Sequence, residues 1–304
     1  MHEVATLLGD AAHSSCAPRQ RRAAESPSMN DATPPADVAA PRLQPLASMP
    51  AGALRGAVGV LSDIDDTLSA DGRIEAAALA ALQRLAAAGV PVIAVTGRPA
   101  GWSEDFAMRW PVEAIVAENG AVMLRRAGGR LQRSFAQPRA EREANFRRLQ
   151  HCAAAVLARV HGSRLATDSA GRLTDIAVDH GEFAHLEPAQ IDAVVAIMRE
   201  HGLNATVSSI HVNGWIGSHD KFSGARWAVR ETLGIALDPR RWLYVGDSTN
   251  DQLMFEHFEL SVGVANIRRF LPQLAVPPTY LCRHERGAGF AELADALLAA
   301  RVAP

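Results

Sequence analysis

The sequence contains few aromatic residues, few cysteines and no long apolar run. Aromatic side chains make up 5% of the 304 residues although 48% are hydrophobic, so alanine, leucine and valine supply most of the apolar content. No segment approaches the roughly 20 consecutive apolar residues that a membrane helix needs. The N-terminus also lacks the apolar core of a signal peptide. We therefore expect a soluble protein in which alanine-rich helices and short strands surround a buried core.

Charge and cysteine content restrict the possible partners and the compartment. The formal net charge is −2 and the isoelectric point is near 6.6, so the chain has no broad attraction for nucleic acid or anionic lipid. The three cysteines, Cys16, Cys152 and Cys282, are isolated in the sequence. Such spacing indicates neither a zinc site nor a disulfide framework. We expect a cytoplasmic protein that contacts neither nucleic acid nor a membrane.

Composition and apolar patterning divide the chain into a leader and two structured parts. Residues 1–55 are poor in large apolar residues and rich in alanine, proline, serine and arginine, which predicts a disordered leader. Residues 56–120 and 219–304 alternate short apolar runs with helix-like segments, the pattern of a doubly wound parallel α/β sheet. Residues 121–218 combine two long helical segments with alternating strand-like pieces, which predicts an inserted α+β domain.

Three polar clusters follow predicted buried strands of the parallel sheet. They are Ser62-Asp63-Ile64-Asp65-Asp66-Thr67, Thr96-Gly97-Arg98 and Gly246-Asp247-Ser248-Thr249-Asn250-Asp251. In an open parallel α/β sheet the ligand crevice lies at the carboxyl ends of the strands. We therefore expect the three clusters, which are far apart in sequence, to converge in space.

Each cluster taken alone also has a structural explanation. Aspartate and threonine commonly begin helices as N-caps, so the first two clusters are weak signals by themselves. An EF-hand loop starting at Asp63 is excluded, because Leu68 and Ile74 stand where such a loop needs glycine and glutamate. A glycine turn followed by two acids, as at Gly246, has little structural use and is more specific. Lys221 taken alone is more typical of a surface lysine. The evidence for a functional site is that the three clusters and Lys221 occur together, in this order and on the expected elements.

Together these residues resemble the four motifs of the haloacid dehalogenase superfamily of phosphotransferases. The resemblance covers about residues 57–300 and is closest to the Cof-like branch, which includes sucrose-phosphate and trehalose-phosphate phosphatases. The motifs read Asp63-x-Asp65-x-Thr67, Thr96, Lys221, and Gly246-Asp247 with Asn250-Asp251. The branch is indicated by Thr96-Gly97-Arg98, Glu118-Asn119-Gly120-Ala121, the insertion ahead of Lys221, and Val262-Gly263-Val264-Ala265-Asn266.

The resemblance implies a Mg²⁺-dependent phosphatase that acts on a small-molecule phosphate ester, here a sugar phosphate, through a phospho-aspartate intermediate. Asp63 would be the nucleophile and Asp65 the general acid and base, while Thr96 and Lys221 would hold the phosphate. Carboxylates and carbonyls are the hard oxygen ligands that Mg²⁺ prefers. The implied metal ligands are the Asp63 carboxylate, the Asp65 backbone carbonyl and the Asp247 carboxylate, with Asp251 supporting them directly behind or through water.

The inserted domain would then be a cap that closes over the site and selects the substrate. The expected substrate-binding residues are Thr96, Gly97, Arg98, Asn119, Lys221 and Asn250 from the core, and His211 and Asn213 from the cap. His211, Asn213 and Trp215 stand at alternate positions of one predicted strand, so their side chains would share one face. An ordinary structural role in that strand explains His211 equally well.

Several further residues have a structural or an open interpretation. Trp102 is more typical of core packing than of the mouth of the site. Arg164, Asp168 and Arg172 are typical of a surface turn. Asp66 stands where many relatives carry glycine, and it adds negative charge near the expected metal.

Two other functions are compatible with parts of the pattern. A phosphomutase would use the same Asp63 and Asp65 but would keep the phospho-enzyme from water. A non-catalytic phosphosugar-binding regulator would usually have lost a motif residue, whereas Thr96, Lys221 and Asp247 are all present beside the two aspartates.

Overall fold

The computed structural model describes residues 43–302, whose largest sheet has nine strands. The strand order is β1-β15-β14-β13-β2-β5-β6-β7-β8. Neighbouring strands from β1 to β6 pair in parallel, and β7 and β8 are antiparallel to their neighbours. The doubly wound parallel sheet predicted from the sequence is therefore confirmed, with an antiparallel hairpin at one edge. The strands are β1 (Gln44–Pro45), β2 (Gly59–Ser62), β5 (Val92–Val95), β6 (Ala114–Ala117), β7 (Val122–Ala127), β8 (Arg130–Phe135), β13 (Trp242–Gly246), β14 (Leu260–Gly263) and β15 (Tyr280–Leu281).

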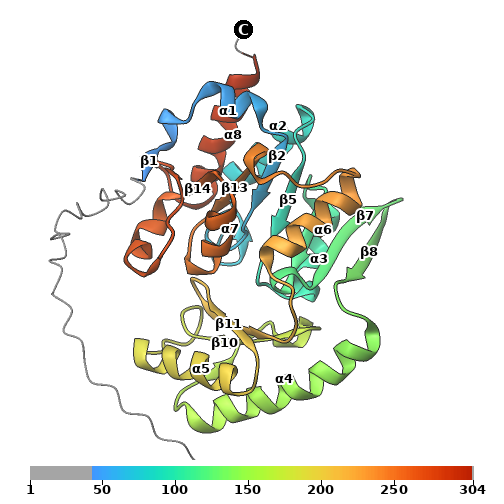
Figure 1. Cartoon of the computed structure of the whole chain (residues 1–304), viewed down its shortest axis with the longest axis vertical. Helices are drawn as coiled ribbons and strands as arrows, with labels where there is room; N and C mark the ends of the chain where they lie inside the picture. Colours follow the sequence, from blue (N-terminus) through green and yellow to red (C-terminus); the bar gives the residue numbers. More distant parts are fainter. Residues whose placement is uncertain (1–42, 303–304) are drawn as a thin grey trace, which may run out of the picture. The chain divides into compact units, whose positions relative to one another are not determined.

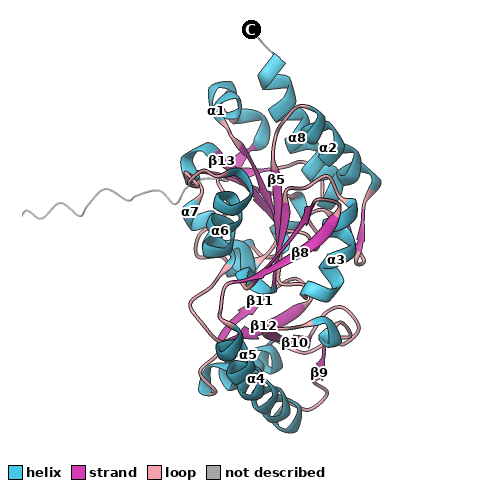
Figure 2. Ribbon diagram, turned by 90° about the vertical axis from the view of Figure 1, so that its right-hand side faces the viewer, coloured by secondary structure: helices cyan, strands magenta, loops and turns pink. Residues whose placement is uncertain are grey.

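Helices cover both faces of this sheet, with α6 and α7 on one face and α2, α3 and α8 on the other (Figure 2). Adjacent residues of one strand bury opposite faces: Val60 packs with the cluster that includes Leu82 and Leu297, and Leu61 with the cluster that includes Val229. Burial on both faces explains why β2 is apolar almost throughout. The helices are α1 (Ala51–Gly56), α2 (Ala76–Ala87), α3 (Ala100–Arg109), α6 (Lys221–Leu233), α7 (Gln252–His257) and α8 (Arg286–Val302).

The inserted region builds a second sheet of four antiparallel strands in the order β11-β12-β10-β9. Helices α4 and α5 pack on this sheet (Figure 1). Val178 and Val212 face these helices, whereas Asp179, His211 and Asn213 alternate with them and belong to the opposite face. The elements are α4 (Arg139–Arg159), β9 (Arg164–Leu165), β10 (Asp175–Asp179), α5 (Pro188–Glu200), β11 (Asn204–Val207) and β12 (His211–Trp215).

The predicted leader extends too far toward the core. Residues 43–55 were expected to be disordered, but they include β1, a 3₁₀ turn at Leu46–Ser48 and most of α1. Leu46, Met49 and Leu54 are buried in the core, and β1 pairs with β15. Three well-spaced apolar side chains anchor this proline-rich segment because the core supplies their partners. The rest of the predicted leader, residues 1–42, lies outside the described residues.

The predicted start of the insertion at residue 121 is also wrong. Strands β7 and β8 hydrogen-bond to the edge of the core sheet at β6, so the cap begins after Phe135. The hairpin turns at Gly128 and Gly129, which both have positive φ, as a tight two-residue turn requires. We refer to residues 136–219 as the cap.

Two sequence-based expectations about the whole chain concern thiols and membranes. Cys152 and Cys282 are buried thiols that form no disulfide within residues 43–302, and Cys16 lies outside that range. No helix in the described part of the chain combines the length and the apolar character needed to cross a membrane.

Candidate active site

The predicted polar clusters lie at the carboxyl ends of neighbouring parallel strands. Asp63 follows β2, Thr96 follows β5 and Asp247 follows β13. The Asp63 backbone N–H donates to the Val245 carbonyl at 2.9 Å, which fixes the first cluster against the strand that carries the third. The structure therefore brings together residues that are far apart in sequence.

Lys221, the first residue of α6, is buried between two of these aspartates. Its Nζ donates to Asp63 Oδ1 at 2.7 Å and to Asp251 Oδ1 at 2.6 Å. Burial by itself would lower the pKa of Lys221, but the carboxylates of Asp251 and Asp63 raise it above its ordinary value. The ammonium group is therefore a permanent cation at the carboxyl end of the sheet.

A glycine allows Lys221 to reach this position. Gly120 has a φ of +107°, and a Cβ there would lie 2.1 Å from the Asp220 carbonyl oxygen. Only glycine lets the two backbones approach so closely. Asp220 caps α6 by accepting a hydrogen bond from the Ser223 N–H at 2.6 Å, so the helix begins at the lysine.

Asp251 uses both carboxylate oxygens inside the protein. In addition to Lys221, its Oδ1 accepts from the Tyr244 hydroxyl at 2.5 Å, and its Oδ2 accepts from the Asp247 N–H at 2.9 Å. Gly246 permits this fold-back, because a Cβ there would lie 2.3 Å from Asp251 Oδ2. These contacts fit a residue that holds the Asp247 loop and Lys221 in place. Tyr244 lies in a strand that was predicted only from its apolar residues, and nothing in the sequence indicated that its hydroxyl contacts Asp251.

Asp63, Asp247 and Asp251 together form a site that fits a divalent cation. One oxygen from each lies within 4.8 Å of the others, and all three residues are buried. Asp247 Oδ2 accepts from Asn266 Nδ2 at 3.1 Å, but its buried Oδ1 has no hydrogen-bond partner among residues 43–302. Burial, together with the neighbouring carboxylates, raises the pKa of both Asp63 and Asp247 well above the ordinary value. An unpartnered buried oxygen beside excess negative charge suits a hard cation such as Mg²⁺.

Asp65 lies between the clustered aspartates and the cap. Arg98 Nε donates to its two carboxylate oxygens at 2.9 and 3.1 Å. The same guanidinium pairs with Glu182 at 2.9 Å and with Asp168 at 3.1 Å, both from the cap. Arg98 was expected to bind substrate, but three carboxylates occupy its donors here, so it links the core to the cap. Asp168 was expected on a surface turn, and the structure places it in this network instead.

A second buried network joins the Gly97 turn to the cap sheet. Arg172 Nη1 donates to the Gly97 carbonyl at 3.0 Å and to Asp175 Oδ1 at 2.9 Å, so Arg172 also does not decorate a surface turn. Asn213 Nδ2 donates to the same carbonyl at 3.1 Å, and Asn119 Nδ2 to Asp175 Oδ2 at 3.4 Å. Burial outweighs the pairing with Arg172 and raises the pKa of Asp175 to about 7.

The other predicted side chains are placed as follows. His211 Nε2 lies 3.0 Å from Glu182 Oε2, on the Arg98 network. Trp215 Nε1 donates to the His219 carbonyl at 2.8 Å. Thr96 is fully buried, and its Oγ1 accepts from the Arg98 N–H at 3.0 Å. Trp102 is partly buried and packs against the core, as expected, with the Arg98 guanidinium 5.0 Å from its ring centre.

Glu118, which was given no role of its own in the motif Glu118-Asn119-Gly120-Ala121, positions backbone groups of the core and the cap. Its buried carboxylate accepts from the N–H groups of Ala100, Leu173 and Thr174 at 2.6–3.1 Å, and from the Thr174 hydroxyl. It therefore joins the start of α3 to the cap loop before β10. Glu118 and Asn119 have φ values of 51° and 55°, in the left-handed region that such residues rarely adopt. The Glu118-Asn119-Gly120 motif could be recognised in the sequence, but its left-handed backbone conformation could not be predicted from it.

The links through Glu182 predict a pH-dependent contribution to stability. Burial opposes ionisation, but hydrogen bonds from His211 and Arg98 outweigh it and lower the pKa of Glu182 from 4.5 to about 2. Because the folded-state pKa is the lower one, the stabilisation is complete above pH 4.5 and is lost as the pH falls toward 2. Glu182→Gln should lower the free energy of unfolding by about 2 kcal/mol at pH 7.

Urea unfolding of both proteins at pH 7 and pH 3 measures this difference. The gap between wild type and Glu182→Gln should shrink at pH 3. Glu143→Gln, at a position exposed on α4, is the matched control and should show almost no gap at either pH. A Glu182→Gln gap that is the same at both pH values would contradict the assigned role.

Two adjoining cavities lie at these residues. The inner cavity has a volume of only about 10 Å³, room for about one water molecule, and is lined by Asp63, Asp65, Asp247 and Asn250, together with Gly97 and cap residues such as His211 and Asn213. Asn250 is oriented by the Ser248 hydroxyl, which donates to its Oδ1 at 2.9 Å. The outer cavity, of about 190 Å³, shares Asp65 and Arg98 with the inner one. The nucleophile position and the space for a substrate are therefore contiguous.

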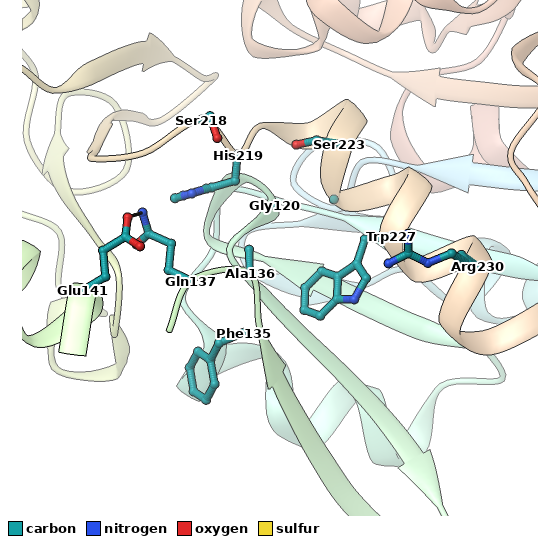
Figure 3. Close-up of a pocket in the computed structure, with 11 residues that line it drawn as sticks. Gly120, Phe135, Ala136, Gln137, Glu141, Ser218, His219, Ser223, Trp227 and Arg230 are labelled. Atoms are coloured by element: carbon teal, nitrogen blue, oxygen red, sulfur yellow. Dashed lines mark hydrogen bonds between the residues drawn. The ribbon is translucent and has the colours of Figure 1, made fainter. Parts of the chain in front are cut away.

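A third hollow, of about 450 Å³, lies beside the two connections between core and cap (Figure 3). Gln137 from one connection donates to the Ile216 carbonyl of the other at 2.9 Å. His219 lines the same hollow, and neither of its ring nitrogens has a hydrogen-bond partner within residues 43–302. None of the clustered aspartates lines this space, so the candidate active site is the pair of cavities at the strand ends.

The fold and site define an α/β protein with a carboxylate-based site at the strand ends and an α+β cap beside it. The family model of the haloacid dehalogenase-like hydrolases matches residues 60–154. Over these residues the match bears out the resemblance to haloacid dehalogenase-like hydrolases. A comparison with curated protein sequences found no relative.

Solved structures share the fold along most of the chain. A protein of Thermoplasma acidophilum has a TM-score of 0.61 at 17% identity, over 80% of this chain and 99% of its own. A candidate HAD/COF-like hydrolase from Plasmodium vivax has a TM-score of 0.61 at 16% identity, over 82% and 98%. The sucrose-phosphatase of Synechocystis, solved with sucrose and phosphate, has a TM-score of 0.57 at 16% identity, over 79% and 98%. At these identities the likeness establishes the fold.

Proposed function

We propose that this protein is a Mg²⁺-dependent phosphatase that hydrolyses a small phosphate ester, a sugar phosphate or similar metabolite, through a phospho-aspartate intermediate. The observation that carries the proposal is that Asp63, Asp65 and Asp247 line one cavity while Lys221 donates a hydrogen bond to Asp63. The fold shared with sugar-phosphate phosphatases supports the same reaction class.

Asp63 is the proposed nucleophile. Its Oδ1 is held by Lys221, which leaves the carboxylate fixed at the inner cavity. Attack on phosphorus forms a bond to Asp63 and breaks the bond to the ester oxygen, giving an acyl phosphate that water then hydrolyses. The Lys221 ammonium lowers the repulsion between the carboxylate and the phosphate and stabilises negative charge on the phosphoryl oxygens.

Asp65 is the proposed general acid and base. Its carboxylate lines both cavities, so it lies between the nucleophile and the space for the leaving group. It would donate a proton to the departing ester oxygen and later accept one from the attacking water. Arg98 orients this carboxylate and joins it to the cap through Glu182.

The carboxylates of Asp63 and Asp247 are the proposed cation ligands, with Asp251 held behind them and the Asp65 carbonyl as a further predicted ligand. A bound Mg²⁺ would orient the phosphate and neutralise part of its charge. Thr96 begins the turn at the end of β5, where its hydroxyl and the nearby backbone N–H groups are suited to a phosphate.

Phosphate release from a panel of sugar phosphates and simple esters tests the proposal. We expect release with Mg²⁺, loss of release with EDTA, and recovery when Mg²⁺ is added back in excess. Absence of release from every ester by folded protein with Mg²⁺ would contradict a phosphatase and would favour a mutase or a binding protein. A bisphosphate requirement without net phosphate release would identify the mutase.

A further inference from the structure

Asp66 holds two arginines at the outer cavity. Arg269 Nη2 lies 3.0 Å from Asp66 Oδ2, and Arg286 Nε lies 3.0 Å from Asp66 Oδ1. The Asp66 side chain is 14% exposed, whereas those of Arg269 and Arg286 are 48% and 36% exposed. A largely buried carboxylate therefore fixes two guanidinium groups that remain open to the cavity.

The backbone conformation is unusual at Asp66 and at Arg286. Asp66 has a φ of 53° and Arg286 a φ of 49°, in the left-handed region. Asn266 fixes both, because its Nδ2 donates to the Asp66 carbonyl at 2.9 Å and its Oδ1 accepts from the Arg286 N–H at 3.0 Å. Residues with a side chain adopt this conformation at a cost, and such strain is concentrated at functional sites.

The two arginines keep hydrogen-bond donors free at the outer cavity. Within residues 43–302 their guanidinium groups make one hydrogen bond, from Arg269 Nη2 to Asp66 Oδ2 at 3.0 Å. Arg269 Nη2 also lies 3.6 Å from Asp247 Oδ2, so Asp66 and Asp247 together balance the charge of the arginine pair. Asp65 and Glu182, which also line the cavity, are both paired with Arg98, and Asp71 lies on the β3–β4 hairpin (Ser69–Ala70 and Arg73–Ile74). The remaining N–H groups of Arg269 and Arg286 are therefore available to an oxyanion in the cavity.

We propose that Arg269 and Arg286 bind a second anionic group of the substrate, a carboxylate or a phosphate, while the reacting phosphate lies at Asp63. The inference rests on the proposed function for the identity of the reacting phosphate. Planar guanidinium groups bind such oxyanions through paired, charge-assisted hydrogen bonds. Asp65 lines both the outer cavity and the small inner one beside Asp63, so the two arginines and the nucleophile are near enough for one molecule to contact both. The site then prefers phosphate esters that carry another acid over esters that are otherwise neutral.

Calorimetric titration of the Asp63→Asn protein with Mg²⁺ measures this preference without turnover. One matched pair of ligands is 3-phosphoglycerate and glycerol 3-phosphate, which differ by a carboxylate in place of a hydroxymethyl group. The other is fructose 1,6-bisphosphate and fructose 6-phosphate, which differ by a second phosphate. In at least one pair, we expect the ligand that carries two acidic groups to bind about 10- to 100-fold more tightly than the ligand that carries only the phosphate. The two pairs distinguish a carboxylate from a phosphate.

The double variant Arg269→Gln/Arg286→Gln, made in the same background, should reduce that ratio to near one. Arg268→Gln is the matched control, because Arg268 is exposed beside Arg269 but does not line the cavity, and its ratio should not change. The ratio of the two dissociation constants within a pair does not change when part of the protein is unfolded, because both titrations then contain the same fraction of folded protein.

Equal binding within both pairs, a preference that survives the double variant, or no binding of any of the four ligands would overturn the proposal. The same ligands offered to wild type separate this result from the reaction itself. A ligand preference without hydrolysis would reject the phosphatase and keep the anion site, whereas hydrolysis without a preference would do the reverse.

Discussion

Replacing Asp63 with asparagine should abolish phosphate release, lowering kcat by at least about 10⁴-fold. Asparagine has nearly the same shape but offers no anionic oxygen for attack on phosphorus. The fold should survive, because Asp251 still pairs with Lys221 and because asparagine removes one of several mutually repelling buried carboxylates. Steady-state phosphate release, measured alongside thermal unfolding, checks both parts of the prediction.

The control for Asp63→Asn is Asp105→Asn, which makes the same chemical change at an exposed position on α3 and should leave kcat unchanged. Mass spectrometry of the assayed protein detects deamidation back to aspartate. Full activity in a sample free of deamidation would refute Asp63 as the nucleophile.

Asp65→Asn should have an effect that depends on the leaving group. With an alkyl phosphate the departing oxygen needs a proton, so kcat should fall by about 10²- to 10⁴-fold. With 4-nitrophenyl phosphate the leaving group departs without a proton, so formation of the phospho-enzyme should be nearly normal while its hydrolysis by water is slow. Comparison of the two esters in wild type and variant measures this dependence. Since hydrolysis of the phospho-enzyme is common to both esters and limits kcat in the variant, the comparison is made in kcat/KM, which reports phospho-enzyme formation. An equal loss of kcat/KM with both esters would contradict the acid role.

The apolar strands and the residues that follow them could be predicted from the sequence. Strands such as β2 and β13 are buried on both faces and are flanked by helical patterns. Their positions along the chain, and those of Asp63 and Asp247 at their ends, therefore follow from local sequence. The convergence of the clusters then follows from the parallel arrangement of the strands.

Contacts across long distances in sequence could not be predicted in this way. The pairing of Asp66 with Arg269 and Arg286 depends on how β2 and the start of α8 are brought together, and no local pattern encodes it. Arg98 matched a substrate-binding motif, yet its partners Asp168 and Glu182 come from the cap.

The two misplaced boundaries have a similar cause. Strand β8 has no fully buried residue, and Arg133 stands between its two large apolar side chains, Leu131 and Phe135, so its apolar pattern is weak. The pairing with β7 and the packing of Leu131 and Phe135 against the core place it in the sheet. The segment from Leu46 to Leu54 has too few apolar residues to form a core alone, but it is buried against a core that the rest of the chain provides.

The most direct test of the central claim is rapid mixing of Asp65→Asn with 4-nitrophenyl phosphate and Mg²⁺. The account predicts a burst of one equivalent of nitrophenol per protein, followed by slow turnover. Acid-quenched protein should carry one phosphoryl group on the peptide that contains Asp63. Slow release without a burst, or a phosphoryl group on another residue, would contradict a phospho-Asp63 intermediate.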